Sequence, residues 1–128
     1  MESARVLDVG NCDPDHGAIR AMLVNHFHVR VDRVMFVPEA LAAIEQARYD
    51  LVLVNRLIFA DDSDGMTLVR ALQTRGPSAP PVMLVSNFAS AQQAAVAAGA
   101  HPGFGKASLG SEETLERLAE FLPAKSPT

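Results

Sequence analysis

Several features are scarce in this sequence, and each scarcity excludes a class of protein. Among its 128 residues there is one cysteine, Cys12, so the chain forms no internal disulfide and suits a reducing compartment. No apolar run reaches the roughly 18 residues of a membrane-spanning helix, and no basic segment followed by a long apolar stretch marks a secretory signal. Basic runs are missing and the net charge is −4, which argues against a nucleic-acid partner. We therefore expect a cytoplasmic protein that binds neither membrane nor nucleic acid.

What the sequence does contain is a regular alternation of apolar runs and helical patterns. Hydrophobic residues make up 48% of the chain and charged residues 20%, which suffices for one hydrophobic core. Such alternation is typical of βαβ units around a parallel sheet. The predicted strands are 6–9, 30–36, 51–54, 82–85 and 103–105, and the predicted helices begin near residues 13, 38, 65, 89 and 111. We predict one α/β domain at 4–122, followed by a tail at 123–128.

The pattern within each apolar run predicts the position of its strand in the sheet. The runs 51–54 and 82–85 show no polar alternation, as expected of strands that are covered on both faces. The run 30–36 alternates like a strand near an edge. Together these patterns favour a doubly wound, five-stranded parallel sheet in the order 2-1-3-4-5.

Two kinds of polar residue in these elements need partners. Asp8 lies inside the buried first strand, where an unpaired carboxylate is costly, and Arg30 and Arg33 on the neighbouring strand are the candidate partners. At the helix starts, we expect Asp13 to cap the first helix and Ser111 to cap the fifth.

In a sheet of this order, functional residues gather at the carboxyl ends of the strands, near the switch between the first and third strands. The polar residues expected at that edge are Asn11, Cys12, Asp13, Asn55, Ser86 and Lys106. Asn55 directly follows the buried third strand, and we expect it to hydrogen-bond the loop after the first strand. A carboxamide is a poor nucleophile and a weak ligand for divalent cations. We therefore expect Asn55 to act neither as a nucleophile nor as a metal ligand.

Several different short motifs follow one another along the chain. They are Asp13-Pro14-Asp15-His16 after the first strand, Tyr49 to Val54 before Asn55, Asp64-Gly65 at the third helix, Ser86 ending the fourth strand, Ala98-Gly99-Ala100 closing the fourth helix and Gly105-Lys106 ending the fifth strand. In order and spacing the chain resembles a response-regulator receiver domain over nearly its whole length. This resemblance implies the flavodoxin-like (βα)5 fold and a two-component signalling pathway.

The resemblance also implies a set of site positions, and the sequence departs from the family at most of them. The acidic pair that holds Mg²⁺ in such domains falls on Asn11 and Cys12, and the phosphoacceptor aspartate falls on Asn55. The hydroxyl and the ammonium group are retained as Ser86 and Lys106. All three carboxylates are replaced, and Mg²⁺ binds poorly to amide and thiol ligands. The chain resembles an atypical receiver, or pseudo-receiver, that lacks the phosphoacceptor aspartate.

The expected function follows from that departure. We expect no enzymatic activity, no cofactor and no metal, but a phosphorylation-independent module that signals by protein contact. The expected contact face comprises the helix 89–98, the strand 103–105 and the helix from 111 to 122. There the aromatic residue that reports activation in the family falls on Gly103, with Phe104 as its neighbour. The partner on this face is either another signalling protein or a second copy of the chain.

An alternative is a working phosphoacceptor that uses a displaced aspartate, Asp13 or Asp61, and then dephosphorylates itself. Asp13 is the nearest candidate to Lys106, because a one-residue bulge after Gly10 would turn it into the site. Without such a substitute, Asn55→Asp alone should not restore phosphorylation. Restoring the acidic pair as well, through Asn11→Asp and Cys12→Asp, is the sequence-based route to a magnesium site.

Other ligands are disfavoured by the sequence. No glycine-rich loop follows the first strand, which argues against a flavin or nucleotide site. Asp13 and His16 are three residues apart and not two, which argues against cobalamin. The loop that contains Asp61, Asp62 and Asp64 is acidic, but we expect its charges to be solvated and Asp64 to cap the third helix.

Overall fold

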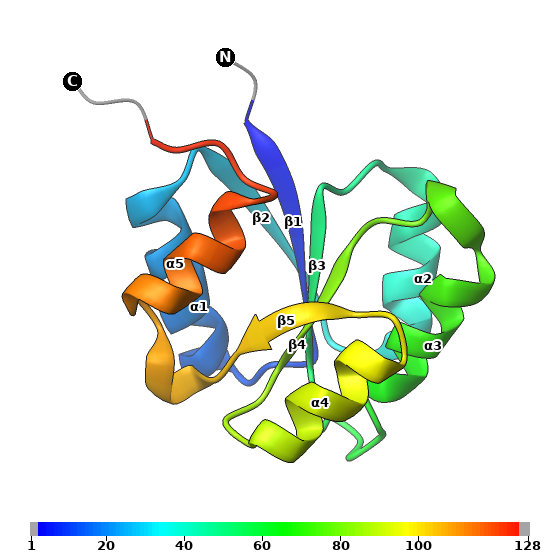
Figure 1. The fold of residues 1–128 in the computed structure, drawn as a ribbon. Helices are drawn as coiled ribbons and strands as arrows, with labels where there is room; N and C mark the ends of the chain where they lie inside the picture. Colours follow the sequence, from blue (N-terminus) through cyan, green and yellow to red (C-terminus); the bar gives the residue numbers. More distant parts are fainter. Residues whose placement is uncertain (1–2, 126–128) are drawn as a thin grey trace.

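The computed structural model of the chain describes residues 3–125. Its strands are β1 (Ala4–Val9), β2 (Val29–Val34), β3 (Leu51–Asn55), β4 (Val82–Val85) and β5 (His101–Phe104). Its α-helices are α1 (Asp13–His26), α2 (Val37–Gln46), α3 (Met66–Thr74), α4 (Ala89–Ala97) and α5 (Glu112–Ala119). The five strands form one parallel sheet in the order β2-β1-β3-β4-β5, which confirms the predicted fold class (Figure 1). Within residues 3–125, no helix is both long and apolar enough to cross a bilayer.

The helices cover the sheet in two layers (Figure 1). Helices α1 and α5 pack on one face, where Ile19, Leu23 and Leu118 are fully buried. Helices α2, α3 and α4 pack on the other face around Leu68 and Leu72. The uninterrupted apolar runs of β3 and β4 are the physical reason for this arrangement, because a strand that is apolar on both sides must be covered on both sides.

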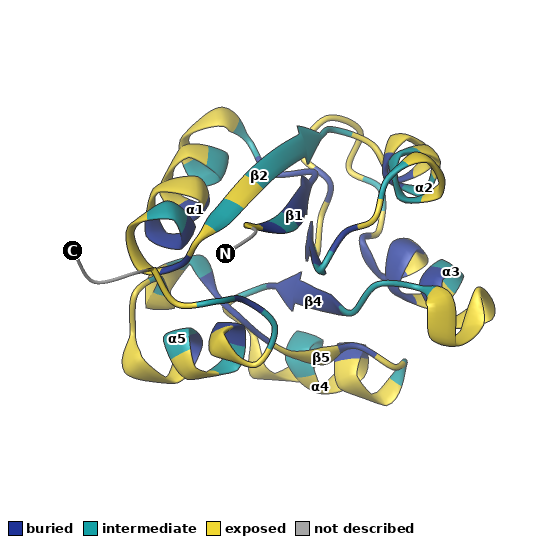
Figure 2. Ribbon diagram, turned by 90° about the horizontal axis from the view of Figure 1, so that it is seen from above, coloured by how far each residue is buried: buried dark blue, intermediate teal, exposed yellow. Residues whose placement is uncertain are grey.

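Burial varies across the sheet as the sequence predicts. All residues of β4 are buried, whereas β2 is mostly half-buried at one edge (Figure 2). The strand β2 ends at Val34 and not at residue 36, because the carboxylate of Glu39 accepts hydrogen bonds from the backbone N–H groups of Met35 and Phe36. Those two N–H groups belong to the start of α2 and not to the sheet.

Helix α1 begins one residue differently from the prediction. Its N-cap is Cys12, and Asp13 is the first helical residue, so the expectation that Asp13 caps the helix is wrong. The cap of α5 is confirmed, since the Ser111 hydroxyl accepts a hydrogen bond from the backbone N–H of Thr114. At α3 the N-cap is Gly65 and not the expected Asp64, whose carboxylate, one residue earlier, accepts a hydrogen bond from the N–H of Met66.

The strand β5 differs from its predicted span of 103–105, because it runs from His101 to Phe104 and contains a bulge. Met83 pairs with His101 and Val85 pairs with Phe104, so three residue steps on β5 oppose two on β4. The extra residue interrupts the ladder near Gly103.

The predicted tail begins as ordered structure. His28 donates its N–H to the carbonyl of Pro123, and Ala124 bridges Phe27 in the antiparallel sense. Residues 123–125 therefore pack against the connection between α1 and β2. The rest of the predicted tail, 126–128, lies outside the described residues.

Candidate functional site

A pocket of about 320 Å³ lies at the carboxyl edge of the sheet, between the loops that follow β1, β3 and β4. Four of the six residues predicted for this edge line it, namely Cys12, Asn55, Ser86 and Lys106. The lining also includes residues that the sequence prediction missed: Asp15, Arg56, Leu57, Phe59, Asp62, Val85, Asn87 and Phe88. Asn11, which lies between β1 and α1, and Asp13, the first residue of α1, are outside the lining.

Asn55 ties two loops together, as predicted. Its side-chain amide nitrogen donates to the carbonyl of Leu57 at 2.7 Å and to the carbonyl of Gly10 at 3.3 Å. The side chain of a carboxylate could make neither bond, because it carries no N–H. The amide at this position thus joins the loop after β3 to the loop after β1, and its donors face the backbone.

Lys106 is held by Asp15. The Lys106 ammonium nitrogen lies 2.8 Å from an Asp15 carboxylate oxygen. The hydrogen bond from Lys106, together with one from the Cys12 thiol, lowers the pKa of Asp15 below its usual value. The carboxylate therefore stays ionised well into the acidic range, and this ion pair weakens only as the pH falls through that lowered pKa.

Asp13 does not partner Lys106, so that expectation is wrong. The Asp13 carboxylate lies 2.8 Å from the Arg33 guanidinium, and its side chain is 89% exposed. The cause is the position of the helix start. With Cys12 as the N-cap, Asp15 is the third helical residue, whose side chain turns back over the N-cap. An acidic residue three positions after a helix N-cap is the sequence signal that identifies Asp15 in hindsight.

A second polar cluster lies under the pocket, inside the fold. Asp8 and Asn11 are both fully buried, and the Asn11 amide donates to the Asp8 carboxylate at 2.6 Å. The Nδ1 atom of His16 lies 2.6 Å from the other Asp8 oxygen. Neither Arg30 nor Arg33 binds Asp8. Arg30 donates to the side chain of Asp32, and Arg33 donates to the carbonyl of Asn11. The Asp8 carboxylate is contacted instead by His16 from α1.

These residues do not form the magnesium site that the resemblance to receiver domains implies. Asn11 is buried with its carbonyl oxygen unpaired, Cys12 offers a thiol, and the Asn55 donors face the backbone. Among the lining carboxylates, Asp15 is already bound to Lys106. Within residues 3–125, no three His, Cys, Asp or Glu side chains are grouped so as to hold a metal ion. Mg²⁺ requires near-octahedral oxygen ligands, and this donor set does not supply them.

The three carboxylates of the acidic loop, Asp61, Asp62 and Asp64, have different surroundings. The hydroxyl and the N–H of Ser63 both donate to the Asp61 carboxylate and lower its pKa. Asp64 accepts a hydrogen bond from the N–H of Met66 at the start of α3, and Asp62 lines the pocket. The three carboxylates therefore do not converge on one point.

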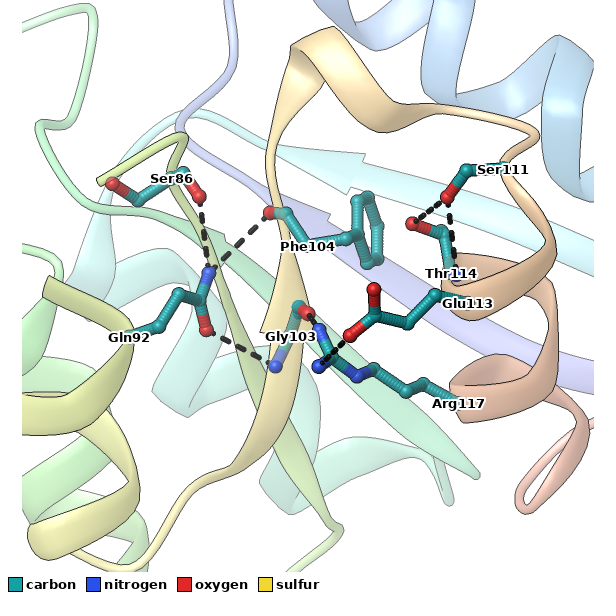
Figure 3. Close-up of polar contacts among 8 residues, drawn as sticks. All are labelled: Ser86, Gln92, Gly103, Phe104, Ser111, Glu113, Thr114 and Arg117. Carbon is teal, nitrogen blue, oxygen red and sulfur yellow. Dashed lines mark hydrogen bonds and ion pairs between the residues drawn. The ribbon is translucent and has the colours of Figure 1, made fainter. Parts of the chain in front are cut away.

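Hydrogen bonds and burial fix Ser86, Gly103 and Phe104, the positions that the resemblance links to activation. The Ser86 hydroxyl accepts a hydrogen bond from the N–H of Phe88. The N–H of Gly103 donates to the Gln92 side chain from α4, and its carbonyl accepts from Arg117 on α5 (Figure 3). Phe104 points into the core against α5 and is 3% exposed, so it contributes little to the molecular surface (Figure 3).

The side chain of Gln92 serves several backbone groups at once. Its amide nitrogen donates to the carbonyl of Leu84 at 2.9 Å. The same nitrogen donates to the carbonyls of Ser86 and Phe104, at 3.2 and 3.4 Å (Figure 3). With the bond from Gly103, this one side chain connects α4, β4 and β5. Sequence reasoning missed Gln92, since a glutamine on an amphipathic helix usually indicates only a solvated position.

The fold is similar to that of solved response-regulator receiver domains. A proposed response regulator from Chloroflexus aurantiacus J-10-fl matches with a TM-score of 0.79 and 21% identity, over 94% of this chain and 98% of that one. The beryllofluoride-activated NtrC4 receiver domain dimer matches with a TM-score of 0.73 and 18% identity, over 91% and 93%. NtrX from Brucella abortus matches with a TM-score of 0.74 and 21% identity over 93% of this chain, which spans 27% of NtrX. No family model and no curated protein matches the sequence.

Proposed function

We propose that the chain is a receiver-like signalling module that acts without phosphorylation, through protein contacts in a two-component-type pathway. The receiver fold supports the pathway. The observation that carries the proposal is the state of the pocket: Asn55 donates to backbone carbonyls, and Asp15 occupies Lys106. A phosphoryl group would find neither an acceptor carboxylate after β3 nor a free ammonium group. The proposal includes no catalytic step, cofactor or metal, and it places the module in the cytoplasm, in keeping with the free thiol of Cys12.

The contact face in this proposal is formed by α4, β5 and α5. In a switchable face, side chains move between two arrangements. Here both backbone groups of Gly103, which lies between the two helices, are fixed: its N–H donates to Gln92 and its carbonyl accepts from Arg117. A face held in this way is ready to bind without an activating event.

A beryllofluoride titration tests the proposal. We expect that beryllofluoride with Mg²⁺ leaves the amide NMR spectrum of the ¹⁵N-labelled chain unchanged, because Asn55 replaces the acceptor carboxylate and the pocket carboxylate of Asp15 is already paired with Lys106. Fluoride with Mg²⁺ but without beryllium is the matched control, and a receiver domain with its aspartate provides the positive control. Shifts that spread from the pocket to α4, β5 and α5 would contradict the proposal.

The ion pair of Asp15 favours a second candidate function, a phosphoacceptor that uses a displaced aspartate and then dephosphorylates itself. The sequence candidates are Asp13, which pairs with Arg33, and Asp61, which binds Ser63. The structure adds Asp15, which shares the pocket with Lys106 and Ser86. Of these three aspartates, only Asp15 lines the pocket that Lys106 and Ser86 also line.

Intact-mass measurement after incubation with acetyl phosphate separates the two functions. For the phosphorylation-independent module, we expect no adduct of about 80 Da, the mass of one phosphoryl group. An adduct that persists in Asp13→Asn and disappears in Asp15→Asn would establish the second function instead. Circular dichroism of both variants controls for loss of fold.

A further inference from the structure

The pocket at the carboxyl edge of the sheet has an apolar mouth. Within residues 3–125, five large apolar side chains are exposed, and three of them line this one pocket: Leu57, Phe59 and Phe88. They are 48%, 63% and 64% exposed. Single exposed apolar side chains are normal on a protein surface, whereas a group of them around a hollow indicates a binding site.

Backbone contacts fix the loops that carry the two aromatic rings. Ile58, next to Phe59 in the loop after β3, is fully buried, and the N–H of Phe59 donates to the carbonyl of Gly10 at 2.9 Å. In the loop after β4, the N–H of Phe88 donates to the hydroxyl of Ser86 at 3.2 Å. The apolar mouth is therefore present before a ligand arrives, as is usual for small-molecule sites.

The charges around the pocket balance one another. Its lining contains two acidic residues, Asp15 and Asp62, and two basic residues, Arg56 and Lys106. Asp15 and Lys106 already form an ion pair at 2.8 Å. A lining with no net charge attracts neither anions nor cations, and an apolar mouth penalises the desolvation of either. The pocket therefore favours a neutral ligand.

Two side-chain amides in the pocket lining have hydrogen-bonding capacity left over. The Asn55 nitrogen donates to backbone carbonyls, while its oxygen accepts no hydrogen bond from residues 3–125. Asn87 is the reverse: its oxygen accepts from the N–H of Ala107, and its nitrogen donates to no group in that part of the chain. The lining thus offers one acceptor and one donor, the complement of a ligand group with an N–H beside a C=O.

We propose that this pocket binds a neutral, planar heteroaromatic compound that carries a hydrogen-bond donor next to an acceptor. The rings of Phe59 and Phe88 pack against the compound, its N–H donates to the Asn55 oxygen, and its C=O accepts from the Asn87 amide. The volume of about 320 Å³ and the mixture of apolar side chains with a few polar groups are typical of small-molecule sites. The inference rests on the proposed function in one respect, since the pocket must be free of a phosphoryl group.

An aromatic side chain of a partner protein fits this pocket less well. Tryptophan brings an N–H without a C=O, tyrosine brings a hydroxyl, and phenylalanine brings neither. None of them satisfies the Asn55 oxygen and the Asn87 amide with one planar edge. The combination of two aromatic rings with a complementary amide pair therefore selects a small heteroaromatic compound.

Amide NMR titration of the ¹⁵N-labelled full chain with two matched probes tests the proposal. The first probe, 2-quinolinone, is neutral, bicyclic and planar, and carries an N–H beside a C=O. We expect it to shift the signals of residues 56–62 and 86–88, with a dissociation constant of about 1 mM or below, the range that a ligand of its size can reach. The second probe, N-methyl-2-quinolinone, lacks the N–H and is expected to bind about tenfold more weakly, because it leaves the Asn55 oxygen unpaired.

Variants of the chain give the second arm of the test. Phe59→Ala and Phe88→Ala are each expected to weaken 2-quinolinone binding about tenfold, the usual effect of losing one aromatic contact. Phe36→Ala makes the same change at an exposed phenylalanine that does not line the pocket, and should leave the affinity unchanged. Asn87→Asp retains the oxygen that accepts from Ala107 but removes the donor, and should also weaken binding. Thermal unfolding confirms that each variant folds.

Five outcomes would overturn the proposal. They are absence of shifts at about 5 mM 2-quinolinone, shifts centred outside the loops after β3 and β4, equal affinity for the two probes, unchanged affinity in both Phe59→Ala and Phe88→Ala, and tighter binding of the peptide Gly-Trp-Gly than of 2-quinolinone. The last result would assign the pocket to a side chain of a partner protein.

The beryllofluoride titration separates failure of this proposal from failure of the proposed function. A silent beryllofluoride spectrum together with no response to 2-quinolinone removes the small-molecule ligand alone. Shifts that spread from the pocket on addition of beryllofluoride, together with selective binding of 2-quinolinone to the ligand-free chain, remove phosphorylation independence alone.

Discussion

Asn11→Asp is expected to lower the free energy of unfolding by about 3–5 kcal/mol, the usual effect of leaving a buried charge without its partner. The Asn11 amide donates to the Asp8 carboxylate at 2.6 Å, and both residues are fully buried. An aspartate at this position removes the donor and places a second carboxylate against the first. It also creates no metal ligand in the pocket, because Asn11 does not line it. The triple variant Asn11→Asp, Cys12→Asp and Asn55→Asp, which the sequence suggested as a route to a magnesium site, is therefore expected to be destabilised. Its Asn11→Asp component adds no magnesium ligand to the pocket.

Chemical denaturation followed by circular dichroism measures this effect. Asn87→Asp is the matched control: it makes the same chemical change on an exposed residue whose side-chain oxygen already accepts a hydrogen bond from the N–H of Ala107. We expect it to change stability by no more than about 0.5 kcal/mol.

An exchange of the two residues gives a sharper test of the same cluster. The double variant Asp8→Asn with Asn11→Asp retains one amide and one carboxylate, and leaves an acceptor for His16. It should recover most of the stability that Asn11→Asp loses. If Asn11→Asp alone were as stable as Asn87→Asp, the buried pairing of Asp8 with Asn11 and His16 would be refuted.

Gly103→Ala is expected to cost about 3 kcal/mol, the upper end of the penalty for forcing extra atoms into a packed site. A Cβ atom at Gly103 would lie far inside van der Waals contact of the Leu84 carbonyl oxygen and 3.1 Å from the Gln92 side-chain oxygen. The first neighbour is backbone of the adjacent strand, so it cannot rotate away. For the same reason, an aromatic residue at this position cannot serve as a mobile reporter of activation without a change in the bulge.

The matched control for this prediction is Gly17→Ala on α1. A Cβ atom there meets no atom within 4 Å, and alanine stabilises a helix relative to glycine by about 1 kcal/mol. The two substitutions are identical in chemistry and should have opposite signs in a denaturation experiment. Wild-type stability of Gly103→Ala, together with retained NMR signals for Gln92 and Arg117, would show that the bulge is not fixed.

Most of the fold could be predicted because its signals are local. The apolar runs 51–54 and 82–85 indicate strands that are covered on both faces, and the stripe of Ile19, Leu23 and Phe27 indicates the buried side of α1. Strand ends were less certain. The early end of β2 depends on hydrogen bonds that Glu39 makes across a turn, and the bulge of β5 depends on side chains from two helices.

The candidate site was predictable in position but not in its pairings. Cys12, Asn55, Ser86 and Lys106 converge because strand ends of a parallel sheet share an edge. The partner of Lys106 was mistaken because α1 begins at Asp13, and on a helix Asp13 and Asp15 point about 200° apart, so that only Asp15 lines the pocket with Lys106. The partner of Asp8 was mistaken because His16 approaches from α1, and no sequence spacing relates a strand residue to the helix above it.

The β5 bulge also affects how the protein meets other chains in solution. The strand β5 is the outermost on its side of the sheet, and an outer strand can recruit a foreign strand through its unpaired N–H and C=O groups. At Gly103 both groups are already occupied by Gln92 and Arg117, and a bulge bends the strand out of register. At this residue, therefore, β5 offers no free backbone group to an added strand.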